Sequence, residues 1–268
     1  MKKLGHLAEI YKAYDTFIID LWGVMHNGIR LNNEAIKAVD NLSTNNKKVI
    51  FLSNAPRPKK NVMNFLRKIN MNEKYLKNVF TSGEAAINSL RNKKFGDNFF
   101  HLGPKRDSAL FEGFKEKSTN IDLCDFILCT GLFDEHTEDL IYYKNLLSSS
   151  VSKKLVCTNP DLVVHRGNKE EYCAGIIAKI FKELGGDVVY FGKPYKEIYD
   201  MILDKEEKAL VIGDNLNTDI KGANNLKIDA LFITSGVHRS EFEEEKELVE
   251  LLKKYNVSTK FFQKNLTW

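Results

Sequence analysis

The sequence has little proline, little cysteine and no long apolar run. Its 268 residues include 5 prolines and 4 cysteines, and no apolar stretch approaches the roughly 20 residues that a membrane-spanning helix needs. No two cysteines form a CxxC pair, which disfavours a zinc site. The N-terminal segment MKKLGHLAEIYKAYD begins with lysines but lacks the apolar stretch and the cleavage site of a signal peptide. We therefore expect a cytoplasmic protein with reduced cysteines, no membrane partner and a short leading helix.

The sequence also lacks an excess of charge of one sign. It contains 40 lysines and arginines against 36 aspartates and glutamates, which gives a net charge of +4. The charges are interspersed, and lysine pairs such as Lys47–Lys48 are typical of solvated surfaces, so we expect no nucleic-acid partner. The mildly positive balance is compatible with a small anionic substrate. The four cysteines all lie in the middle third and are expected to fill one apolar sub-core: Cys124, Cys129, Cys157 and Cys173.

What the sequence does contain is a regular alternation of strand-like and helical patterns. Strands are expected at 16–20, 48–55, 78–82, 98–103, 125–130, 154–160, 187–193, 209–214 and 229–235. Helices are expected at 33–44, 58–69, 84–92, 137–148, 170–184, 195–203, 217–225 and 241–254. Apolar strands that alternate with helices predict an α/β fold with a parallel sheet. This pattern fits one long sheet, or a core domain of residues 1–80 and 188–268 with an inserted α/β domain at about 81–187.

Polar side chains end the strands that we assign to the core. They are a carboxylate, a hydroxyl with an amide, an ammonium and a second carboxylate: Asp20, Ser53, Asn54, Lys193 and Asp214. In a parallel sheet the carboxyl ends of the strands share one edge, where ligands bind. Asp219 follows five residues after Asp214 and can return to the same place at the start of the next helix. We therefore expect these side chains to form one site.

These residue types predict the chemistry of phosphate. Carboxylates that lie close together repel one another unless a cation lies between them, and hard oxygen ligands suit Mg²⁺. A hydroxyl, a lysine and a helix N-terminus suit phosphate oxygens. A carboxylate that is not fully engaged by a cation can act as a nucleophile and form an aspartyl-phosphate. The alternative for any single aspartate is that it only caps the next helix, but that alternative is weak for the whole set.

Four short segments, in order, resemble the motifs of the haloacid dehalogenase (HAD) superfamily. They are DLWGVMHNG at 20–28, LSNAP at 52–56, GKP at 192–194 and GDNLNTD at 213–219. They resemble in particular the motifs of the class IIA hydrolases, which are NagD-like and nitrophenyl-phosphatase-like. The insertion lies between the second and third motifs, where this class carries its α/β cap, and TNPD at 158–161 is similar to a cap-to-core segment. The resemblance implies a Rossmann-like parallel-sheet core with an inserted C2-type cap.

The resemblance also implies a metal site that contains Mg²⁺. Asp20 would be both the nucleophile and a ligand of the metal. Trp22 would contribute its backbone carbonyl, Asp214 would be a further ligand, and Asp219 would support the metal shell.

The resemblance further implies a phosphate site beside the metal. Ser53 would hold the transferred phosphoryl group with Asn54 alongside, and Lys193 would neutralise the phosphate and position Asp20. Gly23 suits a chain that leaves a strand beside a bound phosphate, because it has no Cβ.

Trp22 departs from the family pattern. The phosphatases of the family usually carry a second aspartate there, which protonates the leaving oxygen and then activates water. Such general acid–base catalysis contributes roughly 10²–10⁴ in rate, so we expect slow turnover of alkyl phosphates or a preference for acyl and aryl phosphates. His26 is one residue that could take over proton transfer. The alternative is that His26 lines the substrate loop or stacks on Trp22.

Residues of the inserted domain are expected to select the substrate, because a cap excludes water and supplies specificity contacts. His165, Arg166 and Tyr172 follow TNPD, and Arg166 could pair with a second anionic group. The alternative for each of the three is an ordinary surface residue. Class IIA relatives often dimerise through the cap, which implies a homodimer here.

The sequence thus predicts a Mg²⁺-dependent phosphatase that acts on a small phosphorylated metabolite through Asp20. Two alternatives remain: another HAD hydrolytic chemistry, such as cleavage of carbon–halogen or carbon–phosphorus bonds, and a weakly active or non-catalytic protein that binds a phosphorylated metabolite. The retained Asp214 and Asp219 favour a metal and a phosphate over carbon–halogen cleavage, and the retained nucleophile argues against pure binding.

Overall fold

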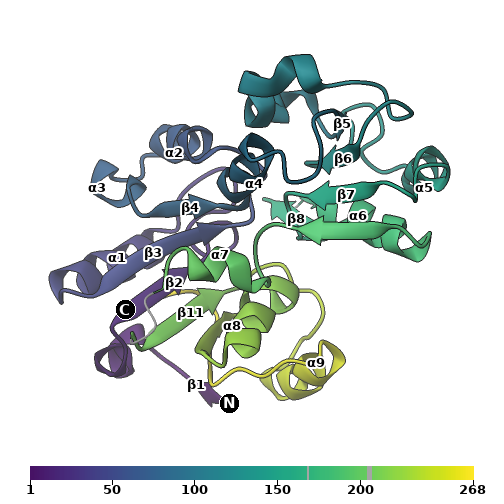
Figure 1. Cartoon of the computed structure of the whole chain (residues 1–268). Coiled ribbons are helices and arrows are strands. Elements are labelled where there is room, and N and C mark those ends of the chain that lie inside the picture. The colour runs from purple at the N-terminus through teal and green to yellow at the C-terminus, as the bar shows by residue number, and fades with distance from the viewer. Residues whose placement is uncertain (168, 204–206) are drawn as a thin grey trace.

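Two separate parallel sheets organise the chain, one in each lobe of the molecule (Figure 1). The computed structural model describes residues 1–167, 169–203 and 207–268. The larger sheet, the core sheet, consists of β1 Lys2–Lys3, β2 Thr16–Ile19, β3 Lys48–Ser53, β4 Val79–Thr81, β11 Ala209–Gly213, β12 Asp229–Ile233 and β13 Phe261–Gln263. Its strand order is β1-β13-β12-β11-β2-β3-β4, and all adjacent strands are parallel.

The second sheet belongs to the inserted segment, which we call the cap. Its strands are β5 Phe99–Leu102, β6 Phe126–Cys129, β7 Lys154–Cys157 and β10 Asp187–Tyr190. They are parallel in the order β10-β7-β6-β5. A short antiparallel hairpin of β8 Val163–Arg166 and β9 Lys169–Tyr172 projects from the cap. The expected α/β fold with a parallel core sheet and a separate inserted sheet is therefore confirmed.

Helices cover the faces of both sheets, and each buries one apolar stripe. The helices are α1 Asn33–Thr44, α2 Lys59–Lys68, α3 Glu73–Leu76, α4 Ser82–Arg91, α5 Leu140–Ser148, α6 Ala174–Glu183, α7 Lys196–Asp200, α8 Lys221–Leu226 and α9 Leu248–Lys254. In α1 the buried residues are Ala35, Ala38, Val39 and Leu42, which is the spacing of a single helix face. The Asn32 side chain caps this helix by accepting from the backbone N–H of Glu34.

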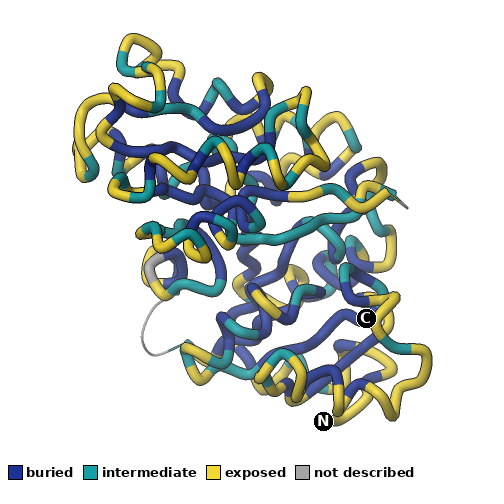
Figure 2. The backbone as a smooth tube through the Cα atoms, turned by 90° about the vertical axis from the view of Figure 1, so that its right-hand side faces the viewer, coloured by how far each residue is buried: buried dark blue, intermediate teal, exposed yellow. Residues whose placement is uncertain are grey.

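The central strands are buried on both faces, which explains why they read as continuous apolar runs. In β2, Phe17 and Ile19 lie in the cluster that includes α1, whereas Ile18 lies in the cluster on the opposite face with α8 and α9. Figure 2 shows the result, with buried strands inside and exposed loops outside. A covered parallel sheet of this kind leaves only its strand ends for polar chemistry.

Three of the four cysteines share one apolar cluster of the cap, as expected, whereas Cys173 is buried at the N-cap of α6 outside that cluster. All four are buried free thiols. Three of them, Cys124, Cys129 and Cys157, lie in one apolar cluster between the cap sheet and helices α5 and α6. They act there as small apolar side chains.

Several sequence-based assignments are wrong in detail. The run 187–193 was assigned to the core sheet, but β10 pairs with β7 of the cap sheet, because an apolar run does not reveal which of two parallel sheets it joins. The expected helix at 170–184 begins only at Ala174, since Lys169–Tyr172 forms the second strand of the hairpin. The leading segment contains β1, which pairs with β13, and two 3₁₀ turns in place of a regular helix. Within the described residues, no helix combines the length and apolar character needed to cross a bilayer.

Candidate active site

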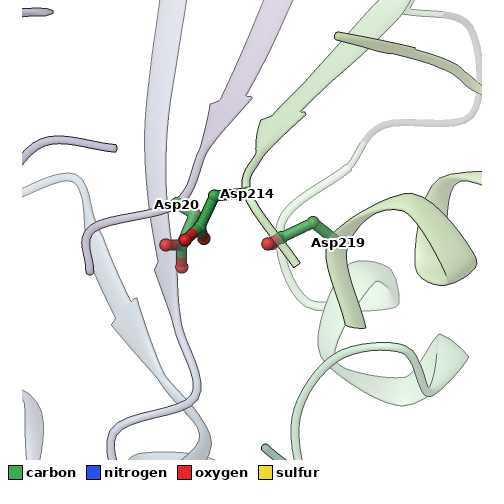
Figure 3. Close-up of side chains that lie close together, drawn as sticks. All are labelled: Asp20, Asp214 and Asp219. Carbon is green, nitrogen blue, oxygen red and sulfur yellow. The ribbon is translucent and has the colours of Figure 1, made fainter. Parts of the chain in front are cut away.

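Three aspartates meet at the carboxyl edge of the core sheet. Strands β2 and β11 are neighbours in register, with Ile19 opposite Ile212, so Asp20 and Asp214 leave the sheet side by side. A π-helical turn over Leu216–Ile220 then brings Asp219 back toward them. Figure 3 shows Asp20 and Asp214 extending from the strand ends and Asp219 pointing to them from the helical segment. One carboxylate oxygen from each lies within 4.8 Å of the others, so the three can hold a metal ion.

Glycines make this crowding of carboxylates feasible around Asp214. A Cβ at Gly23, where φ is +92°, would lie 2.1 Å from Asp214 Oδ2, and a Cβ at Gly236 would lie 1.9 Å from the same oxygen. The backbone N–H of Val237 donates to this oxygen at 2.8 Å. The Asp214 carboxylate is therefore enclosed on two sides by backbone that no other residue type could provide.

The electrostatics of the cluster favour a bound cation. Burial and the nearby Asp219 raise the pKa of Asp214 to about 8. Burial also raises the pKa of Asp20, although the ammonium of Lys193 acts in the opposite direction. A divalent cation would stabilise the ionised carboxylates that burial disfavours.

Lys193 reaches the cluster from the end of a cap strand. Its Nζ donates to Asp20 Oδ1 at 2.5 Å and to Asp219 Oδ1 at 2.7 Å. Burial lowers the pKa of Lys193, but the two aspartates outweigh it and hold the pKa well above its usual value. The ammonium therefore stays charged between the carboxylates of Asp20 and Asp219.

Asn54 fixes the backbone of Lys193. Its Oδ1 accepts from the backbone N–H of Lys193 at 2.8 Å, and its Nδ2 donates to the Lys193 carbonyl at 3.1 Å. Ser53, the last residue of β3, is buried beside it, and its Oγ accepts from the backbone N–H of Ala55 at 3.1 Å. The end of β3 thus supplies the Ser53 hydroxyl and, through Asn54, fixes the position of Lys193.

A cavity of about 1180 Å³ lies over the cluster, between core and cap. It brings together every residue that the sequence analysis assigned to the site: Asp20, Trp22, Gly23, His26, Ser53, Asn54, Arg166, Lys193, Asp214 and Asp219. The two other cap candidates, His165 and Tyr172, also line it. The cavity is large enough for a small metabolite.

His26 packs under Trp22 in the loop that follows Asp20. The two rings lie edge to face with centroids 5.2 Å apart, and Phe65 contacts the His26 ring in the same way at 5.3 Å. His26 Nδ1 accepts from the backbone N–H of Gly28 at 3.0 Å. Burial lowers the pKa of His26 to about 4, so the ring is neutral at pH 7.

Asp161 is a residue to which sequence reasoning gave no role. Its Oδ1 accepts from Asn54 Nδ2 and from Asn215 Nδ2, both at 3.2 Å. Burial raises the pKa of Asp161 to about 6. It joins the cap segment between β7 and β8 to two loops of the core. The signal was its place in TNPD, a segment quoted above only for its resemblance.

His238 was also missed, although it follows a strand of the same sheet edge. Its Nε2 accepts from the backbone N–H of Leu216 at 3.0 Å, so Nδ1 carries the proton and donates to Glu241 Oε1 at 2.5 Å. The pair fixes the loop that carries Asp214 and Asp219. The usable signal was the position of GVHRSE after β12, next to β11 in the sheet.

Comparisons with known proteins agree with this architecture. The chain matches the family model described as haloacid dehalogenase-like hydrolase over residues 17–115, and the model described as HAD-hydrolase-like over residues 190–255. The chain belongs to the haloacid dehalogenase superfamily and, within it, to the class IIA hydrolases of the NagD and p-nitrophenyl phosphatase type.

Individual relatives extend the likeness to almost the whole chain. The chain is 26% identical to the acid sugar phosphatase of Staphylococcus haemolyticus over 249 residues, which covers 88% of this chain and 90% of that protein. It is 26% identical over 162 residues to the ribonucleotide monophosphatase NagD of Escherichia coli K12, with coverage of 59% and 62%. A crystal structure of a haloacid dehalogenase-like hydrolase from Brucella suis 1330 superposes with a TM-score of 0.85 at 27% identity and covers 100% of both chains.

Proposed function

We propose that the protein is a Mg²⁺-dependent phosphatase that acts on a small phosphorylated metabolite through an aspartyl-phosphate on Asp20. The observation that carries this proposal is the buried cluster of Asp20, Asp214 and Asp219 with Lys193 between two of its carboxylates. The names of the relatives, which include an acid sugar phosphatase and a ribonucleotide monophosphatase, support the substrate class.

The residues present suit a hard divalent cation. The carboxylates of Asp20, Asp214 and Asp219 would hold Mg²⁺, together with the backbone carbonyl of Trp22. When bound, Mg²⁺ would neutralise phosphoryl oxygens and orient the phosphate. All of these ligand atoms are oxygens, and the carboxylate charges repel one another without a cation. The residues therefore suit Mg²⁺.

Asp20 then acts as the nucleophile. Its Oδ1 is engaged by Lys193, which leaves Oδ2 to attack phosphorus. A bond forms from that oxygen to phosphorus while the bond from phosphorus to the leaving oxygen breaks, and the leaving oxygen departs with the electron pair. Water next attacks the phosphorus, the bond to Asp20 breaks with its electron pair returning to the carboxylate, and inorganic phosphate leaves with both protons of the water. Ser53 and Lys193 bind the phosphoryl oxygens in both steps.

The leaving group receives no proton from position 22. An indole does not exchange a proton as a carboxylic acid does, and the contacts of His26 disfavour it as a replacement. Its Nδ1 accepts a backbone hydrogen bond, and burial keeps the ring neutral. We therefore expect efficient turnover only of substrates with good leaving groups, such as acyl or aryl phosphates.

We further propose that the cap selects the substrate. The cap begins at about residue 81, as the sequence pattern indicated, but it extends past 187 to the end of β10 at Tyr190, because this strand pairs with β7. Arg166 would bind a second anionic group, Tyr172 lies on the same hairpin, and the cap surface would form a homodimer. The departure at Trp22 favours one alternative function, a weakly active protein that binds a phosphorylated metabolite.

The test is hydrolysis of p-nitrophenyl phosphate and acetyl phosphate, with and without Mg²⁺, beside a panel of sugar and nucleotide phosphates. Asp20→Asn, which keeps the side-chain size and removes the nucleophile, is the matched control. We expect Mg²⁺-dependent release of phosphate that Asp20→Asn abolishes. Tight binding of Mg²⁺ without hydrolysis of any compound would contradict the phosphatase proposal and favour the binding protein.

A further inference from the structure

The loop that follows the nucleophile is joined directly to the cap hairpin. The indole Nε1–H of Trp22 donates to the backbone carbonyl of His165 at 2.8 Å, across 143 residues of sequence. Two residues further along the hairpin, the backbone N–H of Gly167 donates to the carbonyl of Asn27 at 3.2 Å. These two hydrogen bonds connect core and cap at the mouth of the cavity.

The nucleophile loop is shaped to hold the indole in this place. Gly28 has φ +83°, and a Cβ on it would lie 2.6 Å from Trp22 Cζ2, so the ring occupies the space of a missing side chain. The His26 ring supports the indole edge to face. The backbone N–H of Gly23 donates to the His26 carbonyl at 2.8 Å, which closes the loop on itself. The indole therefore lies in a space bounded by Gly28 and the His26 ring, which we call the seat.

Trp22 also contacts Arg166, the next residue of the hairpin after His165. The guanidinium carbon of Arg166 lies 5.2 Å from the centre of the Trp22 ring, in the range of a cation–π contact. Arg166 Nε donates to Glu171 Oε1 at 3.2 Å. Arg166 is thus held by the indole and by a carboxylate, and it lines the cavity over Asp20.

We propose that Trp22 is a positioning residue that clamps the cap hairpin to the nucleophile loop and seats Arg166 for an anionic group of the substrate. The substrate part rests on the proposed function, and it names the class as phosphate monoesters that carry a carboxylate or a second phosphate. An aspartate at position 22 could not replace the clamp, because a carboxylate has neither an N–H donor nor a ring face. This position therefore serves recognition by the cap.

The clamp is tested first without any activity measurement. Trp22→Phe keeps an aromatic ring beside Arg166 but removes the N–H donor together with part of the ring area. We expect hydrogen exchange at the Gly167 amide to accelerate by roughly five- to tenfold, the effect of losing one hydrogen bond. Unchanged exchange in a folded variant would overturn the clamp. Hydrogen exchange at this amide does not depend on phosphate chemistry. The measurement therefore separates failure of the clamp from failure of the proposed function.

A second variant disturbs the seat while keeping the tryptophan. With Trp268 replaced by phenylalanine, Trp22 is the remaining one of the 2 tryptophans, and its quenching by acrylamide reports its exposure. Gly28→Ala should increase quenching. Gly185→Ala is the matched control, because Gly185 has a similar φ of +92° but no atom within 4 Å of its Cβ position. Equal quenching in the two variants would contradict the seat.

The substrate class is tested by inhibition of p-nitrophenyl phosphate hydrolysis. Phosphoglycolate carries a carboxylate beside its phosphate, whereas ethyl phosphate does not. We expect Arg166→Met and Trp22→Phe to weaken inhibition by phosphoglycolate by roughly five- to tenfold, with little change for ethyl phosphate. An equal effect on both inhibitors would overturn the role of Arg166.

Discussion

Replacing Trp22 by aspartate should change which leaving groups the enzyme tolerates. The substitution returns a carboxylic acid two residues after the nucleophile, where phosphatases of the family usually have one. General acid catalysis contributes roughly 10²–10⁴ in rate, and mainly for leaving groups that need a proton. We therefore expect kcat for an alkyl phosphate to rise by about 100-fold, whereas kcat for p-nitrophenyl phosphate should change little.

The contacts of Trp22 also set a cost. Trp22→Asp loses the hydrogen bond to the His165 carbonyl and the contact with the Arg166 guanidinium. A hydrogen bond contributes about 1 kcal/mol and a cation–π contact about 0.5–2 kcal/mol. Together they correspond to at least roughly a tenfold rise in KM for a substrate whose second anionic group binds Arg166. Ethyl phosphate and p-nitrophenyl phosphate lack such a group, so their KM values should change little, and the ratio of their kcat/KM values isolates the acid effect.

The assay is steady-state release of phosphate from ethyl phosphate and p-nitrophenyl phosphate at saturating Mg²⁺. Trp22→Asn is the matched control, because it has the size of aspartate but no acidic proton. We expect the alkyl-to-aryl ratio of kcat/KM to rise in Trp22→Asp and to stay at the wild-type value in Trp22→Asn. An equal ratio in the two variants would show that the missing acid does not limit turnover, and the reasoning on Trp22 would be wrong.

Three further predictions concern the residues around the metal cluster. Because burial raises the pKa of Asp214 to about 8, protons compete with the cation below that pH, and calorimetric titration should show Mg²⁺ affinity falling by up to about tenfold per unit from pH 8 to pH 6. His238→Leu leaves the Leu216 N–H unpaired and should weaken Mg²⁺ binding by about tenfold or more, whereas His238→Gln, which keeps an acceptor, should retain most of it. Asn54→Leu leaves both backbone groups of Lys193 unpaired, so denaturant unfolding should show a loss of about 2–4 kcal/mol, and Asn54→Asp should lose at least as much, because its carboxylate would face Asp161 Oδ1 and the Lys193 carbonyl, to which the amide donates.

The cluster of Asp20, Asp214 and Asp219 could be predicted from the sequence because its determinants are local. Asp20 and Asp214 each end an apolar run, and the carboxyl ends of parallel strands meet at one edge whichever loops join them. Asp219 required only that the chain turn once after Asp214, which the π-helical turn does. Each inference used the sequence within a few residues of one strand, so it did not depend on knowing the rest of the fold.

The route of Lys193 into the site could not be predicted in the same way. The run that precedes it has the apolar pattern of any buried parallel strand, and only pairing with β7 assigns it to the cap sheet. Lys193 nevertheless lies at the core edge, because Asn54 binds both of its backbone groups. A long-range contact between two loops thus replaced the strand that the sequence analysis expected. His238 was missed for a related reason, since its partner Leu216 belongs to another loop.

Trp22 shows why a departure from a motif is informative only with the rest of the fold in place. From the sequence alone, the tryptophan is a lost acid, and His26 is a reasonable replacement four residues away. In the structure the two rings pack on one another, and the indole donates to the cap. A proton donor must reach the leaving oxygen, whereas a clamp must face the hairpin, and one side chain cannot do both. Substrates are then distinguished by how good their leaving group is and by whether they carry an anionic group that Arg166 can bind.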